Sequence, residues 1–195
     1  MSCDTTIDFC VRAGVTFEAV FQCATDELTT VAITAITKAA PPVITAAAHG
    51  MPDAWEAAVV SAGGMTRINA ENYPPRGRDW KRARAASINT VEMSDCNSAD
   101  YATYTSGGFL VYSTPKSLAG ATARMIIRDA PIDGTVLATL TSSPAAGLTV
   151  NDSAKTITAA LATAALTWST GYYDLEVTDS AGVITQPATG TITIT

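Results

Sequence analysis

Histidine is almost absent from this chain of 195 residues, in which His49 is the only one. A metal site built from several histidines is therefore excluded. The sequence also lacks the GxSxG motif of serine hydrolases and the GxxxxGK(S/T) loop that holds phosphates. Lys and Arg number 12 against 18 Asp and Glu. This acidic balance disfavours a general nucleic-acid-binding protein, because phosphate binding needs a surplus of cations.

Long apolar runs and a signal peptide are missing as well. No run approaches the roughly 18 apolar residues of a membrane-spanning helix. The first residues, MSCDTTIDFCVR, do not place a basic segment before an apolar one, as a signal peptide does. We therefore expect a soluble intracellular product with no membrane partner, and no cofactor is expected.

Cysteine is scarce, and its spacing does not match a zinc site, which typically uses CxxC pairs. A reducing cytosol disfavours disulfides, so we expect buried free thiols. A disulfide, and a metal-binding or catalytic role, are the alternatives. The residues concerned are Cys3, Cys10, Cys23 and Cys96.

Alternation of apolar and polar side chains is the main pattern that the sequence does contain. Within 13–23 every second residue is apolar, as in a strand with one buried face. These apolar residues include Val15, Phe17, Ala19 and Phe21. The same period returns from residue 121 to the C-terminus, in runs that contain Met125, Ile157, Leu175 and Ile192. Turn sequences rich in Gly, Pro, Asn or Asp separate these runs.

These short strands and turns predict an all-β protein. We expect residues 1–29 and 113–195 to form an immunoglobulin-like antiparallel sandwich, in which the opening strand pairs with the strand at 121–128. Segment 160–168 is rich in Ala and Leu, and it is the one place where we expect a short helical turn.

Residues 30–112 are interpreted as a second small β unit, barrel-like and inserted into the first. Pro-Pro, His-Gly and Gly-Gly breakers separate its short strand candidates, which are VAITAIT, VITAA, AAVVSA and GGFLVY. Inserted domains are tolerated when their two ends lie close together. The insertion explains why the opening strand lies about a hundred residues before the rest of its module.

The first module resembles a known group of phage proteins. Its segments AGVTFEAVF, LAGATARMIIRDAPIDGTVLATL and GYYDLEVTDSAGVITQPATGTITI resemble the immunoglobulin-like modules of phage tail and baseplate proteins. They are similar to the amino-terminal domain of the upper baseplate protein of lactococcal phages. Tyr173, Asp174 and Leu175 stand where those modules carry Tyr-Asp-Leu before the final hairpin. Pro187 and Ala188 depart from the two leucines that the family often has before the last strand.

The insert resembles small β modules of phage structural proteins. These modules are named for their similarity to the first catalytic cysteine half domain of ubiquitin-activating enzymes. The matching pieces are ITKAAPPVITAAAHGMPD, VVSAGGMTRINA and YATYTSGGF. That half domain is a β fold without the catalytic cysteine, so the resemblance implies no ubiquitin chemistry.

Both resemblances imply a non-enzymatic bacteriophage virion protein that is assembled in the host cytoplasm. We expect an adaptor or attachment component of the tail, baseplate or tail fibre, present in several copies and bound to other virion proteins. A capsid decoration protein is the first alternative. A module that binds host-surface glycan is the second, and its aromatic candidates are Tyr101, Tyr104 and Tyr112.

The segment PPRGRDWKRARAAS at 74–87 holds an uneven share of the 12 basic residues. A solvated loop, a docking surface for an acidic protein and a nucleic-acid contact are the three interpretations, and the acidic net charge disfavours the last. Arg and Trp dominate interface hot spots, so any partner-binding energy is expected here first. The partner-binding candidates are Arg76, Arg78, Trp80, Lys81, Arg82 and Arg84.

Other candidates for chemistry have plainer interpretations. His49 precedes a glycine and is expected to pack in a turn, although a Cys96–His49 pair is formally possible. Asp174 and Glu176 share one face of a strand, where a solvated surface is expected rather than a calcium or acid-catalytic site. The terminal segment TGTITIT is expected to offer a free strand edge to a neighbouring subunit.

Overall fold

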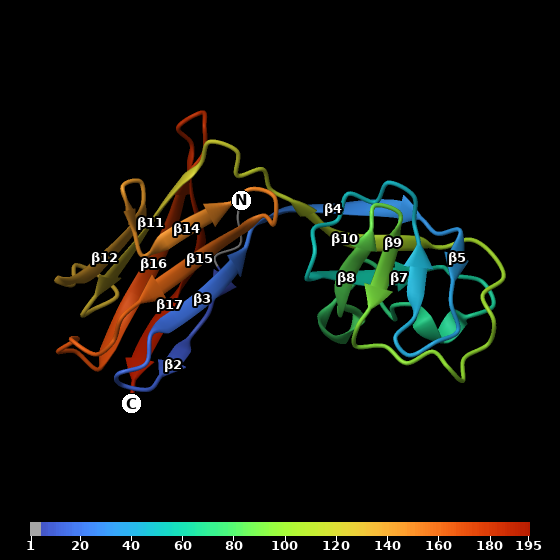
Figure 1. Ribbon diagram of the computed structural model, residues 1–195, viewed down its shortest axis with the longest axis horizontal. Helices are drawn as coiled ribbons and strands as arrows, with labels where there is room; N and C mark the ends of the chain where they lie inside the picture. The colour runs from blue at the N-terminus through green and yellow to red at the C-terminus, as the bar shows by residue number, and fades with distance from the viewer. Residues whose placement is uncertain (1–4) are drawn as a thin grey trace. The chain divides into compact units, whose positions relative to one another are not determined.

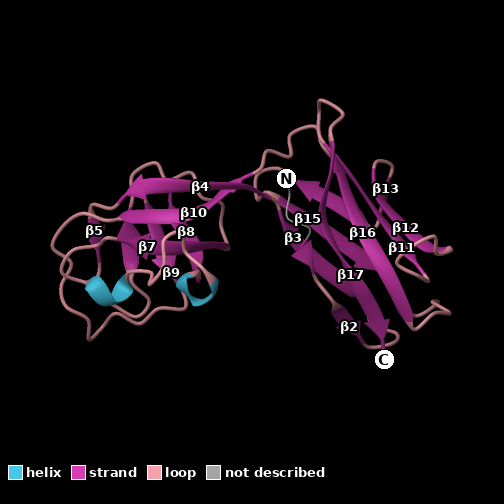
Figure 2. Ribbon diagram, turned by 180° about the vertical axis from the view of Figure 1, so that it is seen from behind, coloured by secondary structure: helices cyan, strands magenta, loops and turns pink. Residues whose placement is uncertain are grey.

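A computed structural model describes residues 5–195. The all-β prediction is confirmed, since strands hold 51% of the residues and helix is almost absent. Two short 3₁₀ helices, η1 (Thr66–Ile68) and η2 (Gly77–Asp79), interrupt the strands (Figure 2). No helix within the described range is both long and apolar enough to span a membrane. The chain divides into two compact units, 5–24 with Lys116–Thr195, and Thr25–Pro115.

The first unit contains two sheets. The larger sheet has the order β1-β17-β16-β11-β12-β13, and β2 also pairs with β17. The smaller sheet has the order β14-β15-β3. Their strands are β1 (Thr5–Thr6), β2 (Phe9–Val11), β3 (Phe17–Gln22), β11 (Thr122–Arg128), β12 (Val136–Ser142), β13 (Ala145–Ala146), β14 (Leu148–Asn151), β15 (Thr156–Leu161), β16 (Thr170–Thr178) and β17 (Ile184–Ile194) (Figure 1).

The period-2 pattern of β3 places its apolar side in the core of the first unit. Phe17, Ala19 and Phe21 are buried, whereas Val15 precedes the strand and is half exposed, contrary to the expected alternation. This core is shared by both sheets, because Met125, Tyr173 and Leu175 of the larger sheet belong to the same buried cluster. Residues that face the core thus come from strands far apart in sequence.

Two local predictions for this unit are wrong. Strand β3 pairs antiparallel with β15, and not with β11, which lies between β12 and β16 in the other sheet. Segment 160–168 forms no helix. Its first residues, Ala160 and Leu161, pair with β3, because a modest helix propensity is overridden by sheet pairing. Thr163 then donates its hydroxyl to the Val15 carbonyl at 2.6 Å.

The terminal strand is not a free edge, which corrects the expected attachment mode. One side of β17 pairs with β16, and the other side pairs in parallel with β1 and β2. Ile192 at the end of the strand is fully buried. Ile7, Phe9 and Val11 do alternate with exposed residues, but this alternation does not show that the segment pairs with β17.

The second unit is one sheet of seven strands with the order β4-β10-β7-β8-β9-β6-β5. Its strands are β4 (Ala24–Ala32), β5 (Ala35–Ile36), β6 (Val43–Thr45), β7 (Trp55–Val60), β8 (Lys81–Ser87), β9 (Thr90–Met93) and β10 (Phe109–Pro115). The sheet is curled, since its two outermost strands, β4 and β5, are consecutive in the chain. Ile44, Trp55 and Met65 lie in the core that the curl encloses. The Trp55 indole N–H donates to the Ser113 carbonyl at 3.0 Å.

The two ends of the second unit are adjacent in its sheet, because β4 and β10 are neighbours. The hydroxyl oxygens of Thr29 and Thr114 on these strands lie 2.8 Å apart. In the first unit, the N–H of Lys116 donates to the Cys23 carbonyl at 2.9 Å. The chain therefore leaves the first unit and returns to it at one hydrogen-bonded position. The expected domain limits, residues 30 and 112, fall inside β4 and β10.

Candidate functional site

The basic segment 76–84 is not a simple loop. Its first part contains η2, and its second part is strand β8, which pairs with β7 and with β9. Successive side chains of a strand point to opposite faces. Lys81 is therefore on the face of buried Ala83, whereas Arg82 and Arg84 are exposed on the opposite face. Alternation along one strand thus divides the predicted cluster into two groups.

One of the two outward arginines, Arg84, is paired with an acid of a neighbouring strand. The Arg84 guanidinium donates to both carboxylate oxygens of Glu92 on β9, at 2.8 and 3.4 Å. This hydrogen-bonded contact raises the pKa of Arg84. Arg82 lies opposite Glu56 in the pairing of β8 with β7. Arg84 is thus engaged within the sheet surface, and Arg82 lies on the same outward face.

The inward group forms part of a polar pocket of about 410 Å³. Arg76, Arg78 and Lys81 line it together with Arg67, which comes from η1. Tyr101 and Cys96 add to the wall. The Arg67 guanidinium carbon lies 4.3 Å from the centroid of the Tyr101 ring, a cation–π contact that orients this arginine over the pocket wall.

A single carboxylate shapes this pocket. Buried Asp79 accepts hydrogen bonds from the backbone N–H of Arg76 and of Glu71 and from the side-chain amide of Asn72, each at 2.9 Å. These donors, led by the Arg76 N–H, lower the pKa of Asp79 to about 2. The carboxylate stays ionised at neutral pH and fixes segment 71–76 as one rigid piece.

The cations of the pocket outnumber its acids, since, of the described residues, only Glu71 and Asp79 line it with a carboxylate. Within the part of the chain that the structure describes, neither Arg76 nor Arg78 forms an ion pair. Arg67 approaches Asp100 only to 3.8 Å, with both side chains largely exposed. Lys81 donates to the Arg78 carbonyl at 2.6 Å. Such a concentration of positive charge in an acidic chain suits a carboxylate or another anionic group.

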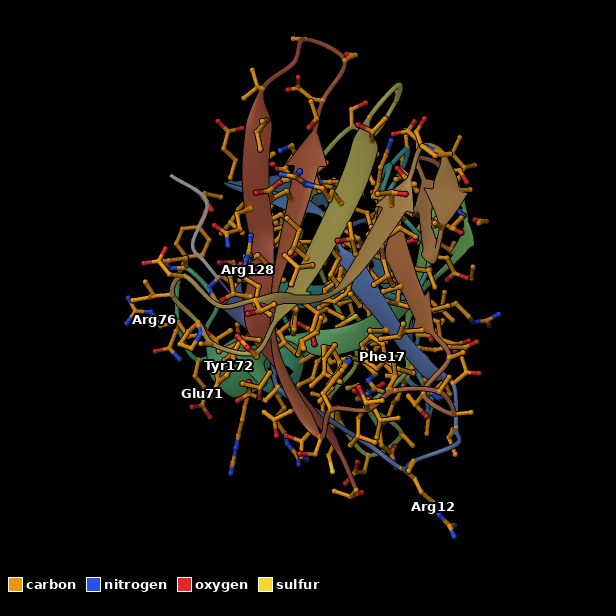
Figure 3. The ribbon with its side chains drawn as sticks, turned by 90° about the vertical axis from the view of Figure 1, so that its left-hand side faces the viewer. Arg12, Phe17, Glu71, Arg76, Arg128 and Tyr172 are labelled. Atoms are coloured by element: carbon orange, nitrogen blue, oxygen red, sulfur yellow. The ribbon has the colours of Figure 1, made fainter. Side chains whose placement is uncertain are left out.

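The pocket brings together only part of the predicted set, since Trp80, Arg82 and Arg84 do not line it. Sequence reasoning missed Arg67, which joins the site through η1 and lies apart from the basic segment. A lone arginine in a polar stretch carries no signal that would single it out. Figure 3 shows Arg76 and Glu71 both at the surface of this unit.

The predicted turn-packing role of His49 is confirmed. It is buried, its Nδ1 accepts from the Met51 N–H at 3.1 Å, and its Nε2 lies 2.8 Å from the Ser87 carbonyl. Both ring nitrogens are thus used by the backbone. The half-buried Cys96 has a raised pKa because burial disfavours its thiolate. A reactive thiolate–imidazole pair is therefore poorly supported.

The cysteine prediction is confirmed in part. Cys10, Cys23 and Cys96 are free thiols, and burial raises the pKa of Cys23 to about 11. Cys10, however, is exposed and not buried, because strand β2 turns this side chain to the solvent. Cys3 lies outside the described residues. Across residues 5–195, no group of three or more His, Cys, Asp or Glu is arranged to hold a metal ion.

Other sequence candidates also have structural roles. Asp174 and Glu176 form ion pairs across strands with Arg128 and Arg124, at 3.0 and 2.7 Å. The neighbouring position of Arg128 and Tyr172 on β11 and β16 is visible in Figure 3. These carboxylates are therefore engaged as the surface charges of a sheet, which agrees with the expected solvated face.

The three tyrosines named for the glycan-binding alternative do not form an exposed platform. Tyr112 is buried, with its hydroxyl donating to the His49 carbonyl. Tyr104 donates to the carbonyls of Ile33 and Gly107, and Tyr101 lies under Arg67. Strand alternation points Tyr112 into the core, so the three rings do not form an exposed surface.

The chain was compared with protein-family models and with curated proteins. No protein-family model matches the chain, and no curated protein matches it.

Proposed function

We propose that the chain is a non-enzymatic structural protein of a bacteriophage virion, acting as an adaptor in the tail, baseplate or tail fibre. The observation that carries this proposal is the basic pocket formed by Arg67, Arg76, Arg78 and Lys81. Arg76 and Arg78 form no ion pair among the described residues, and Arg67 approaches Asp100 only to 3.8 Å with both side chains largely exposed. This is the arrangement of a docking surface for an acidic neighbour.

Strand order supports an immunoglobulin-like fold for the first unit. In such sandwiches one sheet holds strands B, E and D, and the other holds G, F and C, with C′ added in the variable type. If β3 is strand B, the following strands β11, β12, β14, β15, β16 and β17 take the places C, C′, D, E, F and G. The two sheets, β14-β15-β3 and β17-β16-β11-β12, then have that composition.

The path of the chain supports the insertion of a barrel-like second unit between strands B and C. Its end strands, β4 and β10, are neighbours, and the first unit is rejoined where Lys116 bonds to Cys23. Such an arrangement lets a host domain keep its sheets while it carries a second module. In the assembly, the first unit would dock to the particle and the second would supply the basic pocket.

Antibody labelling of purified virions tests the location. We expect label at the tail end, in several copies per particle. Label over the whole capsid shell would favour the decoration alternative, and particles without label would contradict a virion protein of either kind.

The docking role is tested by reversing charge in the pocket. Arg76→Glu with Arg78→Glu should reduce incorporation into particles, because acidic partners would be repelled. Arg82→Glu is the matched control, since this arginine is equally basic and exposed but lies on the opposite face of β8. Equal loss of incorporation in both variants would contradict a specific role for the pocket.

A further inference from the structure

A second pocket, of about 490 Å³, lies in the second unit. Thr30, Phe109 and Val60 line it from the adjacent strands β4, β10 and β7. Ser61 and segment 70–73 form the rest of its lining. Phe109 and Val60 are directly paired across β10 and β7, so two lining positions are set by strand register.

The segment that lines this pocket is firmly held. The Ala70 N–H donates to the Val59 carbonyl at 2.7 Å, which ties the segment to β7. Asp79 then holds the Glu71 N–H and the Asn72 side-chain amide at 2.9 Å each. Only one N–H of the Asn72 side-chain amide is used in these bonds. The side-chain carboxylate of Glu71 remains exposed at the pocket.

The placement of Phe109 is equally constrained. Gly108 has a φ of +87°, and a Cβ at this position would lie 2.8 Å from the backbone of Ala62. Only glycine therefore lets β10 begin this close to the end of β7. The strand thus presents the Phe109 ring at the pocket from its first residue.

Two aromatic side chains at this pocket remain in contact with water. Tyr73 is 70% exposed and Phe109 is 46% exposed. Phe109 lies on a strand that pairs with β7, and Tyr73 lies between Asn72 and Arg76, which are both hydrogen-bonded to Asp79. Large apolar surface kept exposed on rigid elements indicates a binding site.

Polar groups accompany these rings. Glu71 and Asn72 line the pocket from the held segment, Thr30 lines it from β4, and Ser61 lines it just after β7. Sugar rings have apolar C–H faces and hydroxyl edges, so they match aromatic rings that are accompanied by carboxylate, amide and hydroxyl groups. Glu71 is the sole charged residue among those that line the pocket, and its negative charge disfavours an acidic sugar.

We propose that this pocket binds a neutral pyranose sugar, stacked on the more exposed ring of Tyr73 beside Phe109 and hydrogen-bonded by Glu71 and Asn72. The inference does not depend on the basic pocket or on a virion role. It differs from the expected glycan site, whose tyrosines are buried or engaged. A proline-rich peptide also packs on aromatic rings, but such peptides need few polar partners at the walls.

Nuclear magnetic resonance titration of the isotope-labelled full chain tests the proposal. The probes are the methyl glycosides of glucose, galactose, mannose and N-acetylglucosamine, together with a polyproline peptide. We expect at least one glycoside to shift the amide signals of Glu71, Asn72, Tyr73 and Phe109 in a saturable way. Tyr73→Ala should weaken that binding by about tenfold. The Tyr73→Ala variant should fold normally, because the Tyr73 ring is mostly exposed.

The matched control is Ile88→Ala, in the turn between β8 and β9. Ile88 is 72% exposed but does not line the pocket, so this variant should bind the glycoside as the unmodified chain does. Absence of shifts with all four glycosides would overturn the proposal, as would unchanged binding by Tyr73→Ala. Shifts by polyproline alone would overturn it in favour of a peptide groove.

Discussion

The two units use their charged residues differently. In the first unit, Arg124 and Arg128 on β11 lie opposite Glu176 and Asp174 on β16, so each cation meets an acid at the matching register. In the second unit, cations gather at one pocket, while the buried acid Asp79 is used to hold backbone N–H groups. One unit neutralises its charge within a sheet, and the other leaves it available.

This difference indicates where a partner would bind. A cation that already has an acid at 2.7 Å gains little from a second one, whereas an uncompensated cation gains a new contact. The same difference is found within strand β8, where Arg84 is paired with Glu92 and Lys81 lines the pocket. Charge alone does not predict a docking site, because the internal partners of each cation have to be known.

The largest effects are expected from core substitutions that show whether the two units unfold independently. Ile192→Ala in the first unit and Leu110→Ala in the second each remove a fully buried side chain. Each should lower the free energy of unfolding of its own unit by about 2–5 kcal/mol, from lost burial and the cavity left behind. Hydrogen exchange resolved by residue would measure both. If either substitution weakened both units equally, they would not be independent bodies.

Removal of the Asp79 carboxylate should release the wall that both pockets share. Asp79→Ala leaves the N–H groups of Glu71 and Arg76 without their acceptor, so their hydrogen exchange should accelerate strongly. Asp152→Ala, which affects a turn carboxylate of the first unit, is the matched control and should leave those two amides unchanged. Slow exchange at Glu71 and Arg76 in Asp79→Ala would show that other contacts hold the segment.

Acid should have a similar effect on the unmodified chain. The folded pKa of Asp79 is about 2, below the usual value of about 3.9 for an unfolded chain. Its stabilising contribution is therefore complete above pH of about 4 and is lost as the pH falls towards 2. Exchange at the Arg76 amide, corrected for its intrinsic pH dependence, would follow this loss. Protection that persisted below pH 2 would contradict the role of the carboxylate.

Reversing the charge of one arginine in each unit tests whether the first unit uses its arginines for stability and the second for binding. Arg78→Glu should weaken binding of a polyglutamate peptide by about tenfold and leave stability nearly unchanged, since Arg78 has no ion pair among the described residues. Arg124→Glu should do the reverse. It sets two acids against each other at Glu176 and should cost roughly 0.5–1 kcal/mol of stability without affecting the peptide. Calorimetry and thermal unfolding would measure the two effects.

The smallest expected effect is the coupling between Arg128 and Asp174. Both side chains are partly exposed, at 29% and 37%, so water screens their attraction. A double-mutant cycle with Ala at each position should give roughly 0.5 kcal/mol. A coupling several times larger would mean that the pair is part of a wider network, for example through Gln186, whose amide donates to Asp174.

Much of the fold was predictable because the alternation of apolar and polar side chains along a strand is a local property of the sequence. The buried positions Phe17, Ala19 and Phe21, and likewise Leu175 in β16, follow from alternation alone. The pairing of β3 with β15 was not predictable, since alternation gives the face of a strand but not its neighbour. The parallel contacts of β1 and β2 with β17 were missed for the same reason.

The candidate site was predictable only as a concentration of charge. Alternation in β8 separates Lys81 from Arg82, but the strand itself was not expected, because a run rich in Arg and Ala has little strand propensity. Arg67 joins the pocket through tertiary structure. Asp79 holds the residues on both sides of Tyr73, and these hydrogen bonds cannot be read from its position in the sequence.

The bond between the Lys116 N–H and the Cys23 carbonyl has an evolutionary consequence. Everything between these residues begins and ends at one place, so a genome can gain, lose or exchange the intervening stretch of DNA as a single cassette. The pairing of β3 with β15 and of β11 with β16 would survive such an exchange unaltered. Relatives with the same outer sheets and a different, or missing, middle segment are therefore expected.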